Sequence, residues 1–337
     1  MPQITLVLPF LLPLPEFAPD LVRALQAPAL SALLSRTSSG ARSAEQPVNA
    51  LPHESWLARE LGLSPEGQPA FAAAAMRGFG LDPMDGAWFI VNPAHVQIAR
   101  SHSMLADLRQ LGLREDEGRA LYEAARPLCE EIGHALLYGD AGTWFLRADD
   151  WTGIDPATPD TVAGMDLSDF VPRGRAALPW RKLQNEVQMA WHTHPVNAGR
   201  EARRQAFVNS FWLWGGSKGG ARGTGQVASI AAPGWISGLS DHIWEGFDKL
   251  DTLAGRNALL YVGSLAESAI AADWGSWLMQ VQALEAQLFA PLHAAVTQGR
   301  IKSLRIVASS REGLAEFTTT AMAQRKFWRR PTLEALT

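Results

Sequence analysis

Apolar runs and amphipathic stretches alternate along most of the chain. The apolar runs lack the alternation of a half-exposed strand, so they predict strands covered on both faces, as in a parallel sheet. Because these strands are separated by helical segments, the pattern predicts an α/β fold with a mostly parallel sheet. The predicted strands occupy residues 3–9, 87–92, 143–148, 207–214, 227–232, 257–263, 303–309 and 316–322.

Helices are predicted where apolar residues recur at helical spacing. Pro28 can open a helix that runs to Arg36, since proline suits the first helical turn. Leu183 and Val187 lie on one face of a helix predicted over 180–191. Pro127 should kink or break the helix in which it lies. Further helices are predicted over 54–62 and 277–296 and within 115–136.

One stretch interrupts this pattern. Residues 149–180 hold six aspartates and four prolines with little apolar periodicity, which is typical of a long surface connection. The chain has 337 residues, more than most single domains. We therefore predict that residues 1–72 and 206–337 form one α/β core and that residues 73–205 form an inserted α+β subdomain.

Composition excludes several classes of protein. The 30 basic and 34 acidic residues give a net charge of −4, so a broad attraction to nucleic acid or to an anionic membrane is not expected. Cys129 is the only cysteine, which excludes an intrachain disulfide and a CxxC-type zinc site. The apolar N-terminus lacks a basic region, and no run reaches the ~20 apolar residues that span a bilayer. We expect a cytoplasmic protein, and the sequence does not indicate its oligomeric state.

The densest polar cluster begins with His192 and His194. If residues 191–194 are extended, both imidazoles point to one face, as a pair of metal ligands would. No third ligand lies at a recognisable spacing, so we predict neither a metal nor a cofactor there. A site for a small phosphate or carboxylate is the preferred interpretation, since imidazole, amide and guanidinium groups occur within seven residues.

We expect this anion site to lie in a cleft where the insert meets the core. Pro195 ends any helix before it and would turn the following side chains outward. The alternative is that the amide and guanidinium groups only fasten the insert to the core. The residues expected to line the cleft are His194, Asn197, Arg200, Asn209 and Trp212.

A glycine-rich loop over 215–225 follows a predicted strand, where phosphate-binding loops often lie. It does not match the P-loop pattern, and the sequence after it is extended rather than helical. Lys218 and Arg222 are candidate phosphate-facing residues, and a flexible surface loop is the alternative.

The segment 325–331, RKFWRRP, contains four cations and two aromatic residues. Such a segment can stack on nucleic acid or lie on a membrane surface. We prefer the interpretation that it is a solvated end of the last strand with its aromatic residues packed inward.

Several segments together resemble a known family. HPVNAGR…VNSFWLWGG, over 194–216, is similar to a motif of the archaeal-type cofactor-independent phosphoglycerate mutases of the alkaline-phosphatase superfamily. LVLPFLLPLP, APALSALLSRTSSG and LPHESWLARELGLSP resemble three further motifs of that family in the same order. With HTHPVN and FWRRP, the chain resembles the bacterial RpfE-type regulatory proteins even more. The resemblance implies an alkaline-phosphatase-like core with an insert.

The resemblance also implies where a metal centre would lie, and this sequence departs from the pattern there. Pro9 stands where the family has a metal-binding aspartate, and the nucleophilic serine falls near His53. An Asp-His pair falls at Ser309 and Ser310, while a further pair falls within 264–273, where no histidine occurs. The resemblance therefore implies that the metal-dependent mutase reaction is lost.

Three functions follow as hypotheses. The preferred one is a catalytically degenerate relative that keeps a pocket and binds or senses a small phosphorylated or carboxylate ligand. The second is an active phosphotransferase or phosphoesterase, acting through a metal at His192 and His194 or without metal through His53. The third, which the charge makes the weakest, is a nucleic-acid or protein partner module that uses the basic C-terminus.

Overall fold

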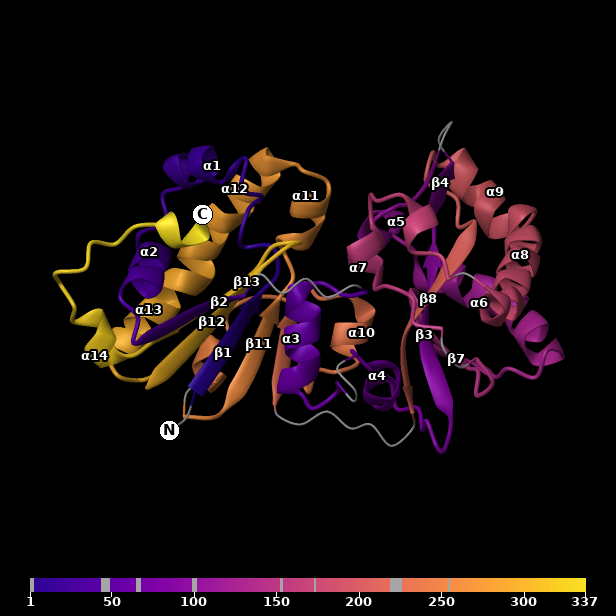
Figure 1. The fold of residues 1–337 in the computed structure, drawn as a ribbon, viewed down its shortest axis with the longest axis horizontal. Coiled ribbons are helices and arrows are strands. Elements are labelled where there is room, and N and C mark those ends of the chain that lie inside the picture. The colour runs from indigo at the N-terminus through magenta and orange to yellow at the C-terminus, as the bar shows by residue number, and fades with distance from the viewer. Residues whose placement is uncertain are drawn as a thin grey trace.

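Two β-sheets, each with its own helices, make up the molecule (Figure 1). The computed structural model describes residues 3–43, 49–64, 68–98, 102–151, 154–172, 174–218, 226–253 and 255–337. The larger sheet has seven strands and the smaller sheet four, and a short hairpin lies beside the smaller one. Helices α3 and α10 lie between the two sheets (Figure 1).

The larger sheet is mostly parallel. Its strand order is β10-β9-β11-β1-β12-β13-β2, and the first five strands are parallel. At one edge, β13 is antiparallel to β12, and β2 is antiparallel to β13. As expected, the first strand pairs with strands from the last third of the chain, with Ile4 opposite both Ala258 and Leu304. The strands are β1 (Gln3–Leu8), β2 (Ser39–Ser43), β9 (Val227–Ile230), β10 (His242–Trp244), β11 (Ala258–Val262), β12 (Ser303–Ser309) and β13 (Leu314–Thr319).

Helices cover both faces of this sheet because its strands are apolar on both. One face, which includes Leu6, packs against α2, α12 and α13, while Val7 on the other face packs with residues of α3. The helix predicted over 277–296 is continuous through a π-helical turn at Glu285–Phe289. The helices of this part are α1 (Ala18–Ala24), α2 (Pro28–Ser35), α3 (Pro52–Glu60), α10 (Gly234–Ser237), α11 (Ala266–Ile270), α12 (Trp274–Leu284), α13 (Ala290–Thr297) and α14 (Ala321–Gln324).

The smaller sheet is antiparallel and has the order β6-β7-β3-β8. Its strand β8 pairs with β3, so the prediction that the run 207–214 returns to the larger sheet is wrong. A run that is apolar on both faces fits either sheet, and only the pairing partner decides which. The strands here are β3 (Ala87–Ala94), β6 (Leu136–Asp140), β7 (Thr143–Arg147) and β8 (Ser210–Lys218), with the hairpin β4 (Val96–Ile98) and β5 (Ser103–Leu105).

The helices of the smaller part include one that passes through a proline. Helix α6 contains Pro127 and continues to Glu131, so of the predicted kink or break the break does not occur. The helix buries Leu121, Ala125 and Cys129 along one stripe, and this packing outweighs the one backbone hydrogen bond that the proline removes. The helices are α4 (Ala72–Gly78), α5 (Leu108–Leu111), α6 (Glu115–Glu131), α7 (Pro159–Val162), α8 (Leu178–His192) and α9 (Pro195–Ala202).

The aspartate-rich stretch 149–180 is not the surface connection that its composition predicts. Trp151, Ile154, Ala157 and Val162 are all buried. Part of this stretch, around Thr158 and Asp160, packs against α3 and the segment that follows β12, and it contributes to the site described below.

The division of the chain into a core and an insert stays a proposal. Because β8 belongs to the smaller sheet, a boundary at residue 206 would divide that sheet, and we place the return to the core between β8 and β9. Within the described ranges, no helix has the length and apolar character needed to cross a bilayer.

Candidate functional site

A buried histidine joins α3 to the end of β12. His53 lies in the first turn of α3, where Pro52 supplies a preset helical φ, and its side chain is almost fully buried. The His53 Nδ1 and Ser309 Oγ are 3.1 Å apart and form a hydrogen bond. Burial lowers the pKa of His53 to about 4, with the Asp160 carboxylate opposing this effect and Arg109 adding to it, so the imidazole is neutral at pH 7.

The next residue, Glu54, is a buried carboxyl group that caps the same helix. Its Oε2 accepts a hydrogen bond from the Leu51 N–H at 2.7 Å and one from the Thr158 hydroxyl at 2.6 Å. Burial raises the pKa of Glu54 to about 8, and the nearby Asp160 carboxylate raises it further. Glu54 is therefore largely protonated at neutral pH, a state typical of carboxyl groups in functional sites and in buried networks.

A buried ion pair lies next to these residues. The Arg109 guanidinium donates to both Asp160 oxygens, at 2.9 and 2.5 Å, and to Asp107 Oδ1 at 2.8 Å. Burial by itself would raise the pKa of Asp160, but the charge and hydrogen bonds of Arg109, together with His53 and Arg311 nearby, outweigh it and hold that pKa below its ordinary value. Arg311 then donates to the backbone oxygens of residues 160, 161 and 163 and ties this segment to the large sheet.

A cavity of about 210 Å³ borders this cluster, between the two sheets. Its single guanidinium, Arg109, is already neutralised by Asp107 and Asp160. Asp140 adds another carboxyl group, whose pKa burial raises. The charges of this cavity therefore do not favour an anion. Its lining residues are Glu54, Asn92, Leu108, Arg109, Asp140, Gly142, Thr143, Pro159, Asp160, Pro233, Gly234 and Trp235.

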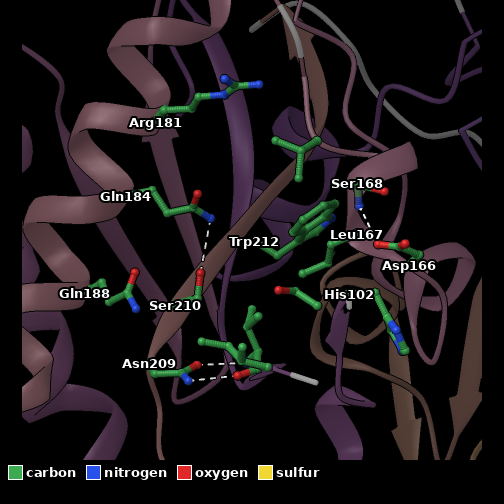
Figure 2. A pocket seen from close by; sticks show the side chains of 14 residues that line it. His102, Asp166, Leu167, Ser168, Arg181, Gln184, Gln188, Asn209, Ser210 and Trp212 are labelled. Carbon is green, nitrogen blue, oxygen red and sulfur yellow. Dashed lines mark hydrogen bonds between the residues drawn. The ribbon is translucent and has the colours of Figure 1, made fainter. Parts of the chain in front are cut away.

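A larger groove of about 660 Å³ lies in the smaller part, between α8, β8 and the β4–β5 hairpin (Figure 2). This volume is in the range of small-molecule sites. The groove has an apolar wall and several polar groups along α8. Its lining residues are Val96, Ile98, His102, Ser103, Asp166, Leu167, Ser168, Val171, Arg181, Gln184, Gln188, Asn209, Ser210 and Trp212.

The α8 wall presents one guanidinium and two amides. Arg181, Gln184 and Gln188 follow at helical spacing along α8 and line the groove together. Gln184 Nε2 donates to Ser210 Oγ at 3.1 Å, which positions the amide. Arg181 donates from Nη2 to the Pro172 carbonyl at 2.6 Å, and its buried Nε has no partner in the described part of the chain. No described carboxylate pairs with Arg181, so its charge is available to an anion.

Two of the predicted site residues, Asn209 and Trp212, do lie in this groove. Their polar atoms are engaged within the protein: Asn209 bonds to both the N–H and the carbonyl of Val96, and Trp212 Nε1 donates to the Ala157 carbonyl at 2.7 Å. They shape the groove by fixing the hairpin and the wall behind it.

Asn197 and Arg200 fasten elements within the smaller part to one another, and the contacts found do not join the insert to the core as the alternative prediction had it. Asn197 Nδ2 donates to the carbonyls of Trp191 and Val208, at 2.8 and 2.9 Å. Arg200 is fully buried, donates at 2.8 Å to Glu117 Oε2 and also donates to the carbonyls of residues 111 and 206. The predicted cleft of five residues is therefore not formed, because the donors of these two are already used.

The other candidates are not brought together. His192 is the exposed last residue of α8, and His194 caps α9 through Nδ1, which accepts from the Val196 N–H at 3.2 Å. The prediction that His192 and His194 form an extended pair of metal ligands is therefore wrong, because the chain turns from α8 into α9 here. Lys218 ends β8 and is exposed, and Arg222 lies outside the described residues. Among the described residues, no three His, Cys, Asp or Glu side chains form a metal-binding group.

Sequence reasoning named His53 and Ser309 of the buried cluster but missed Glu54, Arg109 and Asp160, and it missed Arg181 at the charged end of the groove. Glu54 carried a usable signal, since an acid two residues after a proline that starts a helix is typical of a capping residue. Asp160 and Arg109 are 51 residues apart, and Arg181 is an ordinary helical arginine, so no local pattern indicated them.

Comparisons with known proteins found similarity in fold and, over part of the chain, in sequence. No protein-family model matches the chain. The PH0037 protein of Pyrococcus horikoshii has a similar fold, with a TM-score of 0.54 and 12% identity over 94% of this chain and 87% of that one. A cofactor-independent phosphoglycerate mutase from Thermoplasma acidophilum aligns with a TM-score of 0.48 and 14% identity over 100% of this chain and 94% of that one. The α/β fold with a mostly parallel sheet, expected from the sequence, is confirmed.

In sequence, one curated protein is similar to part of the chain. Over 149 residues the chain is 26% identical to a probable 2,3-bisphosphoglycerate-independent phosphoglycerate mutase of Geobacter sulfurreducens. The alignment covers 43% of this chain and 36% of that protein, so the similarity spans about a third of the relative's length. The predicted resemblance to these mutases is confirmed as a partial similarity.

Proposed function

We propose that the protein is a phosphoglycerate mutase-like protein that has lost the two-metal reaction and binds a small phosphorylated or carboxylate ligand, in a regulatory role like that of the RpfE-type proteins. The observation that carries this proposal is the hydrogen bond between His53 and Ser309 at the end of β12. By the family resemblance, this is where a nucleophile and metal ligands would lie.

The chemistry of these side chains does not fit a pair of metal ions. Proline at position 9 has no side-chain donor, and the Ser309 hydroxyl is bound to His53. Two-metal phosphoryl transfer needs carboxylates and imidazoles around both ions. The nearby acids, Asp107 and Asp160, are paired with Arg109 instead.

The groove in the smaller part suits an anion better than the cavity between the two sheets does. Arg109 in the cavity is neutralised by two aspartates, whereas Arg181 in the groove has no carboxylate partner among the described residues. Along the same helix, Gln184 adds an acceptor oxygen, since its amide N–H groups donate to Ser210 and Phe211, and Gln188 adds a second amide. An anion with hydroxyl groups fits this set.

We expect the purified protein to have no phosphoglycerate mutase activity that depends on a divalent metal. The measurement is the conversion of 3-phosphoglycerate with added manganese or zinc, before and after a chelator, together with elemental analysis. Activity that a chelator abolishes, or close to two ions per chain, would overturn the proposal.

The same assay addresses a second candidate function, a metal-free acid–base enzyme that acts at the cavity between the two sheets. The raised pKa of Glu54 beside the cavity favours this candidate. Phosphoesterase activity that survives the chelator and disappears in the Glu54→Gln protein would support the enzyme in place of the binding protein.

Replacing Arg181 by alanine should weaken anion binding by about tenfold or more, because the change removes the unpaired guanidinium of the groove. Titration calorimetry with inorganic phosphate and with 3-phosphoglycerate measures this loss. Lys182→Ala is the matched control, since Lys182 is the next residue of α8, is 73% exposed and pairs with Glu186 outside the groove.

The control should bind as the unchanged protein does, and both variants should melt at nearly the same temperature. If neither anion binds the unchanged protein, or if Arg181→Ala binds both anions equally well, the groove is not the anion site.

A further inference from the structure

Two large aromatic side chains are exposed at the end of the molecule farthest from the small sheet. Phe327 is 81% exposed and Trp328 is 68% exposed, just after α14 (Figure 1). The sequence-based interpretation that they pack inward is therefore wrong. Exposed aromatic residues next to each other are uncommon on a protein surface without a partner.

Residues 325–330, which we name the basic aromatic loop, also carry four cations. Arg325, Arg329 and Arg330 are exposed, and Lys326 donates to the Thr37 carbonyl at 2.8 Å. None of the four pairs with a carboxylate in the described ranges, whereas Arg109, Arg200 and Arg305 elsewhere do. The whole chain has a net charge of −4, so this loop is a local positive patch on an acidic protein.

The base of the loop is held in place by the fold. Gln324 is buried, and its Nε2 donates to the carbonyls of Ala32 and Arg36 and to Thr319 Oγ1. The Arg329 N–H donates to the Lys326 carbonyl within the loop, and the Arg325 N–H donates to the Met322 carbonyl of α14. The aromatic residues are thus presented by an ordered turn.

We propose that the basic aromatic loop docks the protein on the surface of an anionic phospholipid bilayer. Aromatic rings with cations beside them suit the interface, since the rings enter the boundary between headgroups and acyl chains while the cations attract anionic lipids. The proposal is independent of the ligand in the groove.

The ring geometry favours a bilayer over single-stranded nucleic acid. Sites for nucleic acid present ring faces along a charged groove, on which successive bases stack. The Phe327 and Trp328 rings are instead edge to face, with an interplanar angle of 84° and centroids 5.2 Å apart.

The test is co-sedimentation of the full chain with vesicles of phosphatidylcholine alone and of phosphatidylcholine mixed with phosphatidylserine. We expect binding only to the anionic vesicles, and weaker binding at higher salt. The double change Phe327→Ser and Trp328→Ser should weaken binding at least tenfold, and Arg325→Glu with Arg330→Glu should abolish it.

Matched controls use exposed residues elsewhere. Ile243→Ser removes an exposed apolar side chain, and Lys182→Glu with Arg256→Glu changes charge by the same amount away from the loop. Both controls should bind vesicles like the unchanged protein, and all variants should keep the same circular dichroism spectrum.

Three results would overturn the proposal: no binding of the unchanged protein to anionic vesicles, equal binding by both loop variants, or equal loss in the controls. Light scattering and a single-stranded RNA titration are run in parallel. Self-association or RNA binding that needs Phe327 and Trp328, without vesicle binding, would assign the loop to that partner instead.

Discussion

Replacing Arg200 by alanine should lower the free energy of unfolding by about 3–5 kcal/mol, the cost of leaving a buried ion pair without one partner. The change removes the partner of Glu117, which is itself buried, and two backbone carbonyls lose a donor. Chemical denaturation of the two proteins measures the difference, with the midpoint and slope compared separately.

Arg203→Ala is the matched control for this change. Arg203 also pairs with Glu117, but its side chain is 41% exposed, so its loss should cost at most about 1 kcal/mol. At a temperature where the Arg200→Ala protein is folded, phosphate should bind in the groove as before. If the Arg200→Ala protein kept its melting temperature but lost phosphate binding, Arg200 would be a ligand-binding residue and the fastening role would be wrong.

The stability of the protein should fall between pH 6.5 and pH 8, and the Glu54→Gln change should remove this fall. The pKa of Glu54 is about 8 in the folded state and 4.5 when unperturbed, so in this window the folded chain holds a proton that the unfolded chain has lost. Stability then falls with pH by up to about 1 kcal/mol per pH unit, and the fall weakens as the pH reaches and passes the folded pKa of about 8.

His53 acts in the opposite direction at lower pH. Its pKa falls from 6.5 to about 4 on folding, so the unfolded chain binds the extra proton and stability rises from pH 4 to pH 6.5. The two effects oppose each other between pH 4.5 and pH 6.5, so the window above pH 6.5 isolates Glu54.

Denaturation midpoints of the unchanged and Glu54→Gln proteins across this window give the measurement. Glutamine keeps a side-chain oxygen for the Leu51 N–H and the Thr158 hydroxyl. Glu131→Gln, at an exposed position of α6, controls for loss of a carboxylate. Identical pH profiles for the unchanged and Glu54→Gln proteins would show that Glu54 is ionised in the folded state.

The local pattern predicted those elements whose stability depends on their own residues. The run 3–9 is a strand because apolar and β-branched residues fill both faces, and Pro28 starts a helix because its φ suits the first turn. The long helix near 277–296 follows from its apolar stripe. These features, with the order of strands and helices, were enough to predict the α/β class and the mostly parallel sheet.

The candidate site was predicted only in part, because a site depends on residues that are distant in the chain and carry no local pattern. Asn209 and Trp212 do line a groove, but the residue that gives it charge, Arg181, has no distinctive neighbours in the chain. The motif residues Asn197 and Arg200 drew attention by their side-chain chemistry, which suits an anion and a buried carboxylate equally well.

What decides between such alternatives lies far away in the chain. Arg200 is a fastening residue because Glu117, 83 residues earlier, neutralises it in a buried place. Strand β8 joins the smaller sheet because β3 offers the pairing edge, and Phe327 is exposed because no element covers it. Sequence determined the elements through local backbone and side-chain preferences, whereas pairing, burial and the state of each charge depend on distant partners that only the tertiary structure brings together.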